Sequence, residues 1–304
     1  MDIEFRHPTL DDREWISAKY AQEGCRGCDG SFVNLYLWGR GYGKIARVGD
    51  FLVQFIEING KKFYAYPAGK GDFRWLIRML AEDAKAYGHQ LRILCVTNCR
   101  KNNLEEAFPG KFTYEPVRSS FDYLYEVTRL ADLPGKKLQS KRNHINRFEA
   151  EHSEWHTERI TPENLPEVRA MAEMWYAQYD GETSDEHDFR VERVALGRAF
   201  DEYEELGFEG ILLRAEGNIL AFTMGNRITP DTFDVNFEKA FGEVQGAYPL
   251  INREFARYVR ETHPEIVYLN REDDMGLPGL RKAKESYHPD ILLEKSMATL
   301  AGEL

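Results

Sequence analysis

The sequence lacks any run of about 18 consecutive apolar residues, the minimum that a membrane-spanning helix requires. Its first six residues also lack the basic start and the apolar core of a secretory signal peptide. These two absences predict a cytoplasmic protein with no stable membrane insertion.

Positive charge is in deficit as well, because 40 Lys and Arg residues stand against 51 Asp and Glu residues, a formal net charge of -11. This balance disfavours general attraction to nucleic acid or to anionic lipid, both of which favour net basic surfaces. Any contact with a polyanion must therefore come from a local cluster of cations.

Cysteine is rare, with four residues in the pairs Cys25/Cys28 and Cys95/Cys99. Two such pairs could hold zinc if they met in space. We favour the alternative, because Cys95 lies in the apolar run 91–96, where a free cysteine behaves as a small buried hydrophobe. We therefore expect no metal site, and four reduced cysteines fit a reducing cytosol.

What the chain does contain is typical of a fully folded protein, with 42% hydrophobic and 13% aromatic residues. A length of 304 residues exceeds that of a typical single domain and suits two domains of about 150 residues each. We expect two globular domains, each with its own core.

Hydrophobic periodicity and turn signals predict the same element order, β-α-α-β-β-β-α-β-α-β, in both halves of the chain, with one additional strand at the end of the first half. The elements predicted for the first half are strand 3–6, helices 9–22 and 31–38, strands 44–48, 51–58 and 62–66, helix 72–87, strand 91–96, helix 101–108, and strands 112–117 and 121–127. The elements predicted for the second half are strand 155–160, helices 162–179 and 188–206, strands 208–215, 219–228 and 232–238, helix 247–262, strand 266–270, helix 279–286 and strand 290–296.

This order resembles the acyltransferase fold of the GNAT superfamily, in which an antiparallel meander gives way to parallel pairing with the strand after the central helix. Two copies in one chain are similar to the Fem-type aminoacyl transferases. The resemblance implies an α+β protein of two tandem GNAT-like (acyl-CoA N-acyltransferase) domains with mixed, mostly antiparallel sheets. The expected parts are an N-terminal domain at 1–130, a basic linker helix at 131–153, and a C-terminal domain at 154–304 that bears the site.

The linker helix carries the clearest local cluster of cations in the chain. The cluster consists of Lys136, Lys137, Lys141, Arg142 and Arg147, with Asn143, His144 and Asn146 among them. At helical spacing Lys137, Lys141 and His144 share one face, which predicts a cationic surface for a phosphate-bearing substrate. A merely solvated helix face is the alternative.

The closing stretch 269–289 crowds both signs of charge into a loop with glycine and proline, followed by a short helix. Its charged members are Arg271, Glu272, Asp273, Asp274, Arg281, Lys282, Lys284 and Glu285, and Tyr287 and His288 follow them. A simple connection would need only turn residues and a cap, so this composition favours a polar site over a salt-bridged surface loop.

Two further features complete the predicted site. In the strand 232–238, alternation puts Asp234, Asn236 and Glu238 on one face, where a carboxylate could bind an ammonium group or act as a general base. Solvent exposure of this face is the alternative.

The second feature is Gln245-Gly246, at the start of the helix where the GNAT fold holds the phosphates of its donor. This segment does not reproduce the phosphate loop of that superfamily, which disfavours coenzyme A as the donor. A glycine that simply starts a helix is the alternative for Gly246.

The stretch 135–148, the strand 234–238, and the segments 246–248 and 252–255 look like a bacterial family of unknown function related to the C-terminal domain of phosphatidylglycerol lysyltransferase. The similarity extends over nearly the whole chain. It implies transfer of an aminoacyl group from tRNA to a lipid or to another hydroxyl or amine acceptor. The chain has no counterpart of the membrane-spanning region of the lysyltransferases, which argues against a lipid acceptor.

We therefore expect an acyl or aminoacyl transferase whose donor is aminoacyl-tRNA or acyl-CoA and whose partner is tRNA or a phosphate-bearing small molecule. The alternatives are a coenzyme A dependent N-acetyltransferase and a non-catalytic GNAT-like binding or regulatory module. The expected catalytic residues are Asp234, Glu238, Tyr287 and His288. The expected substrate-binding residues are Lys141, Arg142, Asn143, Gln245, Gly246, Arg271, Glu272, Asp273, Arg281 and Lys284.

Overall fold

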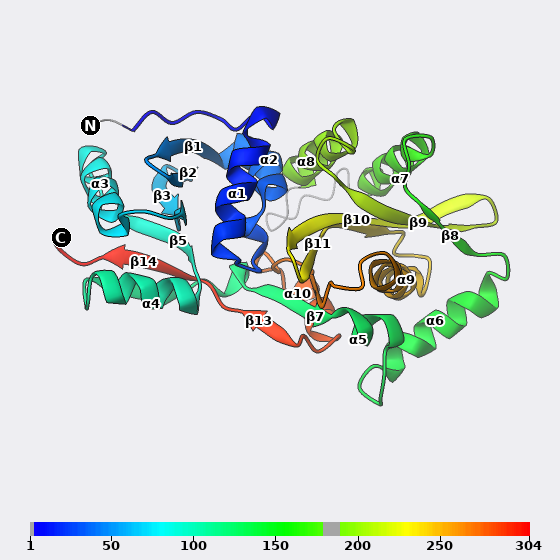
Figure 1. Cartoon of the computed structure of the whole chain (residues 1–304). Coiled ribbons are helices and arrows are strands. Elements are labelled where there is room, and N and C mark those ends of the chain that lie inside the picture. Colours follow the sequence, from blue (N-terminus) through cyan, green and yellow to red (C-terminus); the bar gives the residue numbers. More distant parts are fainter. Residues whose placement is uncertain (1–2, 179–188) are drawn as a thin grey trace. The chain divides into compact units, whose positions relative to one another are not determined.

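The computed structural model describes residues 3–178 and 189–304, which form two compact units. Unit 1 consists of Met1–Asp122, Asp273–Pro278 and Leu292–Leu304, and unit 2 consists of Tyr123–Glu272 and Gly279–Ile291. Each unit is built around one mixed sheet (Figure 1). In the described part of the chain, no helix is both long and apolar enough to span a membrane.

The sheet of unit 1 has the order β1-β2-β3-β5-β14-β6, and β4 pairs with β2. Its neighbours are antiparallel except for β3 and β5, which pair in parallel. The elements are η1 (Leu10–Asp12), α1 (Arg13–Glu23), η2 (Cys28–Gly30), α2 (Phe32–Tyr42), β1 (Gly43–Val48), β2 (Phe51–Ile58), β3 (Lys61–Ala65), β4 (Ala68–Gly69), α3 (Phe73–Ala86), β5 (Arg92–Val96), α4 (Asn98–Ala107), β6 (Phe112–Pro116), η3 (Arg118–Ser120) and β14 (Ser296–Leu300).

Local signals account for the central elements of unit 1. Asn59 and Gly60 adopt positive φ angles of 52° and 71°, the conformation that a tight turn between β2 and β3 requires. Asp72 caps α3, because its side chain accepts a hydrogen bond from the N–H of Trp75 at 2.9 Å. Helix α3 then buries the stripe Leu76, Ile77, Leu80 and Ala84 against the sheet.

The sheet of unit 2 has the order β13-β7-β12-β11-β10-β9-β8, with a parallel pair between β11 and β12. The elements are β7 (Asp122–Glu126), α5 (Val127–Asp132), α6 (Gln139–Glu151), β8 (His156–Arg159), α7 (Leu165–Ala177), α8 (Phe189–Asp201), β9 (Glu209–Ala215), β10 (Asn218–Thr229), β11 (Thr232–Ala240), α9 (Ala247–Thr262), β12 (Tyr268–Asn270), α10 (Pro278–Glu285) and β13 (Ile291–Leu293). Helices α7 and α8 lie on one side of the strands β9, β10 and β11, and α9 lies on the other (Figure 1).

Each sheet thus combines an antiparallel meander with one parallel pair to the strand that follows the central helix. This arrangement confirms the predicted α+β class with two GNAT-like units.

Three details differ from the sequence-based expectations. The segment 3–6 forms no strand and contributes only a single bridge between Arg6 and Ile45. The expected strand 290–296 is two strands, β13 and β14, separated by Glu294 and Lys295. The linker also contains two helices, because α5 ends at Leu133 in the left-handed conformation and Gly135, at φ 75°, separates it from α6.

Each sheet includes a strand from the half of the chain that forms most of the other sheet. Strand β7, from the first half of the chain, pairs antiparallel with β12 in unit 2. Strand β14, near the end of the chain, pairs with β5 and β6 in unit 1. The expected ranges 1–130 and 154–304 assign β7 and β14 to the other unit in each case. Local periodicity locates a strand but does not specify its distant partner.

Candidate functional site

The candidate site of unit 2 begins where β11 and β12 separate. Strand β12 pairs with β11 only over Thr232–Asp234, whereas β11 continues to Ala240. The pairing with β11 ends at Asn270, so that Arg271 follows the point of separation. In the GNAT-like order, this gap between the parallel strands is where we expect the reacting groups to meet.

A β-bulge in β11 changes which side chains face the gap. Between the pairs Met224–Phe237 and Asn226–Asp234, β11 contains one more residue than β10. The crowding opposite Gly225 is extreme, because a Cβ at that position would lie 1.7 Å from the carbonyl oxygen of Asp234. Bulges interrupt the alternation of a strand and redirect its side chains.

The expectation that Asp234, Asn236 and Glu238 share one face is therefore wrong. Phe233 packs against Phe255 of α9, and Glu238, beyond the bulge, also meets α9 through a hydrogen bond from Asn252. Solvent exposure of these polar groups is wrong as well, since Asp234 is fully buried and Asn236 is 8% exposed. Glu238 thus belongs to a different group from Asp234.

Arg271 and Glu238 form the centre of the first group. Nη2 of Arg271 donates to Oε1 of Glu238 at 2.8 Å, and the two side chains are 13% and 10% exposed. Asn252 donates from Nδ2 to Oε2 of the same carboxylate at 3.4 Å. Burial alone would lower the pKa of Arg271, but the charges of Glu238, Tyr125 and Tyr287, together with the hydrogen bond to Glu238, more than offset burial and the pKa is raised.

One nitrogen of the Arg271 guanidinium remains available. Its Nη1 is buried and makes no hydrogen bond with any described residue. The guanidinium carbon lies 5.1 Å from the ring centre of Tyr287 and 5.9 Å from that of Tyr125. A fixed cation with a free donor, beside two aromatic rings, is suited to an oxygen that carries negative charge.

Lys141 completes this group from the first turn of α6. Its Nζ lies 4.1 Å from the ring centre of Tyr287, and no carboxylate of the described residues forms an ion pair with it. Burial and the charge of Arg271 lower the pKa of Lys141 to about 8. We call Lys141, Glu238, Arg271 and Tyr287 the Arg271 group.

Tyr287 is a poor proton acceptor in this setting. Its side chain is 5% exposed, and burial raises its pKa above the ordinary value of a phenol. The ring therefore stays protonated near neutral pH and acts mainly as the surface on which Lys141 and Arg271 lie.

The second group links the bulge to the loop after β12. Nδ2 of Asn236 donates to Oδ2 of Asp234 at 3.2 Å and to Oε1 of Glu272 at 3.5 Å. Glu272 has a φ of 55°, and its N–H donates to Oδ1 of Asn270 at 2.7 Å. A non-glycine residue held in this conformation is characteristic of functional loops.

Lys284 and Tyr125 fix the position of the chain that carries Arg271. Nζ of Lys284 donates to the carbonyl oxygen of Arg271, and the carbonyl of Lys284 accepts a 2.7 Å hydrogen bond from the hydroxyl of Tyr125. Lys284 is 8% exposed, so the structure gives it a positioning role next to the site.

Other expected residues lie apart from the Arg271 group. Arg142 donates from Nη1 to the carbonyls of Leu133 and Gly135, the latter at 2.8 Å, and so closes the turn between α5 and α6. His288 is exposed, with a φ of 54°, and its carbonyl accepts a hydrogen bond from Arg129.

Four more expected residues are not members of the Arg271 group. Asn143 on α6 and Gln245 before α9 are exposed, and Arg281 on α10 is half-buried. Asp273 belongs to unit 1, where its Oδ1 accepts the N–H of Met275 at 3.1 Å.

Gly246 is explained by helix packing. It has a φ of 89°, and a Cβ there would lie 2.3 Å from the carbonyl oxygen of His144 and 2.9 Å from Cβ of Phe148, both on α6. The first turn of α9 also offers few donors, because the N–H of Ala247 bonds to Val244 and Pro249 has none. This helix start is poorly suited to a phosphate.

The comparisons with known proteins agree with this architecture. The model of the family described as "Phosphatidylglycerol lysyltransferase, C-terminal" matches residues 21–299. The chain belongs to this family. By its description, the family is named after a lysyltransferase, which is an aminoacyl transferase.

Several solved structures are similar to this chain. A conserved protein of unknown function from Bacteroides thetaiotaomicron is 39% identical, with a TM-score of 0.90 over 98% of this chain and 100% of that chain. The C-terminal domain of a putative lysylphosphatidylglycerol synthetase from Agrobacterium fabrum is 15% identical, with a TM-score of 0.68 over 96% and 92% of the two chains. FemX is 11% identical, with a TM-score of 0.61 over 98% of each chain. The last two similarities show the fold alone.

A curated relative is an uncharacterised protein of Mycoplasmoides gallisepticum, which is 23% identical over 188 residues. The match spans 61% of this chain and 58% of that protein.

Unit 1 of this lysyltransferase-family chain differs from unit 2 in the region that follows its parallel pair. There Arg100, 3% exposed, uses all three nitrogens: Nε and Nη2 bind Glu23, and Nη1 binds Asp29 and the carbonyl of Cys95. This cation of unit 1 therefore has no free donor, in contrast to Arg271.

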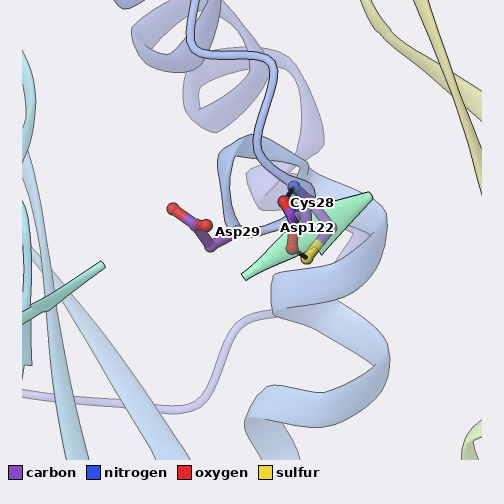
Figure 2. A group of neighbouring side chains, drawn as sticks. All are labelled: Cys28, Asp29 and Asp122. Atoms are coloured by element: carbon purple, nitrogen blue, oxygen red, sulfur yellow. Dashed lines mark hydrogen bonds between the residues drawn. The ribbon is translucent and has the colours of Figure 1, made fainter. Parts of the chain in front are cut away.

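A cluster next to Arg100 has the spacing of a metal site. The ligand atoms of Cys28, Asp29 and Asp122 lie within 4.8 Å of one another. Figure 2 shows Cys28 beside Asp122, whose carboxylate accepts hydrogen bonds from the N–H and the thiol of Cys28. Nζ of Lys295 lies 2.6 Å from Asp29 and 2.8 Å from Asp122, so an ammonium already balances these two carboxylates.

Sequence reasoning missed Asn252 and Tyr125. Asn252 is 2% exposed within the buried stripe of α9, and a polar residue in such a stripe is a signal that a partner lies opposite. Tyr125 stands in a strand that is buried on both faces and gives no comparable signal.

Proposed function

We propose that this chain is an aminoacyl transferase that moves an aminoacyl group from tRNA to a hydroxyl or amine acceptor. The observation that carries the proposal is the free, buried Nη1 of Arg271, which Glu238 fixes where β11 and β12 separate. In unit 1, Arg100 offers no such donor, since all of its nitrogens are engaged. The reaction therefore belongs to unit 2.

Arg271 is the electrostatic element of the proposed reaction. When the acceptor attacks the ester carbonyl of the donor, negative charge develops on the carbonyl oxygen. A guanidinium held at 2.8 Å by Glu238 needs no reorganisation to meet that charge, and its Nη1 is the donor aimed at it. Glu272, the next residue, is half-buried and supplies a carboxylate for the ammonium of the aminoacyl group.

The surface of α6 fits the RNA part of the donor. Between residues 135 and 148 the chain has five Lys or Arg residues and no Asp or Glu, although its net charge is -11. Lys136, Lys137 and Arg147 are exposed, as are Gln139 and Asn146. Cations interleaved with amides are the groups that bind phosphates and riboses of nucleic acids.

The charge order along α6 also argues for an anionic partner. Its first turn contains no acid and follows two lysines, and its last turn contains no base. Cations at the start and acids at the end oppose the helix dipole, which costs the folded protein stability. A local conflict of this kind is expected where a binding partner, here a polyanion, compensates for it.

Coenzyme A is less suited as the donor. The first turn of α9 is packed against α6 at Gly246 and lacks free N–H groups at Ala247 and Pro249. The proposed donor, charged tRNA, would place the reaction in the cytoplasm.

The test is transfer of radiolabelled lysine or alanine from charged tRNA to one of two acceptors: phosphatidylglycerol vesicles, or glycerophosphoglycerol as the soluble form of the same hydroxyl group. We expect the wild-type chain to label at least one acceptor, the Arg271→Met variant to lose the transfer, and Lys282→Met, at an exposed position of α10, to retain it. Retention of tRNA binding without transfer of any label would instead favour a non-catalytic binding module.

A further inference from the structure

Lys141 is the member of the Arg271 group to which the proposed function has so far given no role. It is the third residue of α6, and its side chain reaches the ring of Tyr287 at 4.1 Å, whereas Lys136 and Lys137 before it are exposed. Of these three lysines, Lys141 therefore places its amine in the site.

The groups that face Lys141 come from every element around it. Tyr287 follows α10 and presents the face of its ring to Nζ. Arg271, after β12, lies over the same ring at 5.1 Å and repels a second positive charge. The carboxylate of Glu238 on β11 is already bound to Arg271 at 2.8 Å, and the ring centre of Tyr125 on β7 lies 5.9 Å from the guanidinium carbon.

This environment favours a neutral amine. Burial removes water from the ammonium, and the charge of Arg271 adds to that effect, so that the pKa of Lys141 falls to about 8. At this value about a tenth of the side chain is deprotonated at pH 7, against less than about one part in 1,000 for an ordinary lysine. A lysine that only held phosphate would gain nothing from this depression, because phosphate binds the charged form.

We propose that Lys141 is the general base that accepts the proton of the acceptor hydroxyl or amine. This assignment rests on the proposed aminoacyl transfer and replaces the phosphate-binding role that the sequence suggests for this residue.

Lys141 both accepts and returns the proton that is transferred in this step. Nζ of neutral Lys141 takes the proton from the acceptor O–H or N–H as the acceptor atom forms its bond to the ester carbonyl carbon, and Nη1 of Arg271 stabilises the carbonyl oxygen. When the carbonyl re-forms, the bond from that carbon to the ribose oxygen of the donor breaks. The ribose oxygen then receives the proton from Lys141, which returns to the neutral form.

The pH dependence of transfer separates the base from its alternatives. Because the deprotonated amine is the active form, we expect kcat/KM to rise through about pH 8 and to level off above it. If the ammonium instead donated a hydrogen bond to the ester oxygen or to a phosphate, kcat/KM would fall through the same range. A falling profile overturns the proposal.

Two variants test the chemistry of the side chain. Lys141→Arg keeps the positive charge and removes the titratable amine, and we expect it to lower kcat at least 100-fold. Lys141→Ala should lose a similar factor and recover activity when small primary amines are added, in proportion to their basicity. Wild-type kcat in Lys141→Arg, or no recovery of Lys141→Ala by any amine, contradicts the base role.

A measurement on the whole chain without substrates tests the ionisation of Lys141 independently of activity. Competitive acylation of all lysines between pH 6 and 11, quantified by mass spectrometry, should give Lys141 a midpoint near pH 8 and a higher midpoint in Arg271→Gln. A midpoint near the ordinary value of about 10.4 overturns the proposal. If the midpoint is near 8 but the wild-type chain transfers no label from any charged tRNA, it is the proposed function that fails, and the base role fails with it.

Discussion

Replacement of Gly246 by alanine tests whether this glycine serves helix packing or phosphate binding. A Cβ at this position meets the carbonyl oxygen of His144 at 2.3 Å, and the residue has a φ of 89°. The left-handed backbone costs a residue with a Cβ about 1–2 kcal/mol. Overpacking against the backbone of α6 adds about 1–3 kcal/mol. We therefore expect Gly246→Ala to lower the free energy of unfolding by about 2–5 kcal/mol.

Gly217→Ala is the matched control, because Gly217 has a φ of 78° but nothing within 4 Å of an added Cβ. It should lose only the backbone part, about 1–2 kcal/mol. Urea unfolding followed by tryptophan fluorescence is a suitable assay, since Trp155 packs against Phe148 of α6 with ring centres 6.5 Å apart. Equal losses in the two variants would refute the packing explanation. A stable Gly246→Ala protein that no longer binds its donor would favour the phosphate-binding explanation.

Three further changes test other parts of the structure. Arg271→Met should lower the free energy of unfolding by about 3–5 kcal/mol in urea, because it leaves the carboxylate of Glu238 unpaired. The double variant Glu238→Gln/Arg271→Met should lose less stability than the sum of its two single variants. Additive losses would contradict a buried pair. Lys295→Met removes the ammonium that balances the buried Asp122 and should lower the melting temperature markedly; an unchanged melting temperature would show that this charge network contributes little. The hydrogen bond from Arg6 holds the pKa of Asp12 below its usual range. The stabilisation that this pair gives the fold is therefore present at neutral pH and is lost as the pH falls below about 4. Arg6→Gln should accordingly reduce the difference between the melting temperatures at pH 7 and pH 3.

Much of the fold follows from short-range signals in the sequence. The turn at Asn59-Gly60 and the N-cap at Asp72 both occur as predicted, and so do the elements that they delimit. The same signals in the second half predict β9, β10, β11 and α9. These elements are local in origin, because their hydrogen bonds or hydrophobic stripes repeat within a few residues.

The exchange of β7 and β14 between the two sheets could not be predicted in this way. Tyr123 and Tyr125 of β7 belong to the core of unit 2, whereas Ala298 and Leu300 of β14 belong to the core of unit 1. Nothing in the alternation of either strand distinguishes these partners, since the choice depends on residues that are distant in sequence. Fold recognition from element order succeeded without this information.

The candidate site was predictable in part. The charge pattern pointed to Lys141, Glu238, Arg271 and Tyr287, and the structure brings these four side chains together. It did not reveal that Arg142 closes a turn, and strict alternation put Glu238 with Asp234 on one face. The bulge opposite Gly225 is the physical reason for the second error, because one additional residue reverses the direction of every side chain that follows.

The central claim is that the fixed guanidinium of Arg271 promotes aminoacyl transfer in unit 2. A single-turnover assay tests it most directly, with labelled lysyl-tRNA or alanyl-tRNA, excess folded protein, and either phosphatidylglycerol vesicles or glycerophosphoglycerol as acceptor. The account predicts that Arg271→Met reduces the rate of label transfer by about 100-fold or more, the effect of removing one donor to a developing oxyanion, while tRNA binding persists. Transfer by Arg271→Met at the wild-type rate would contradict the account.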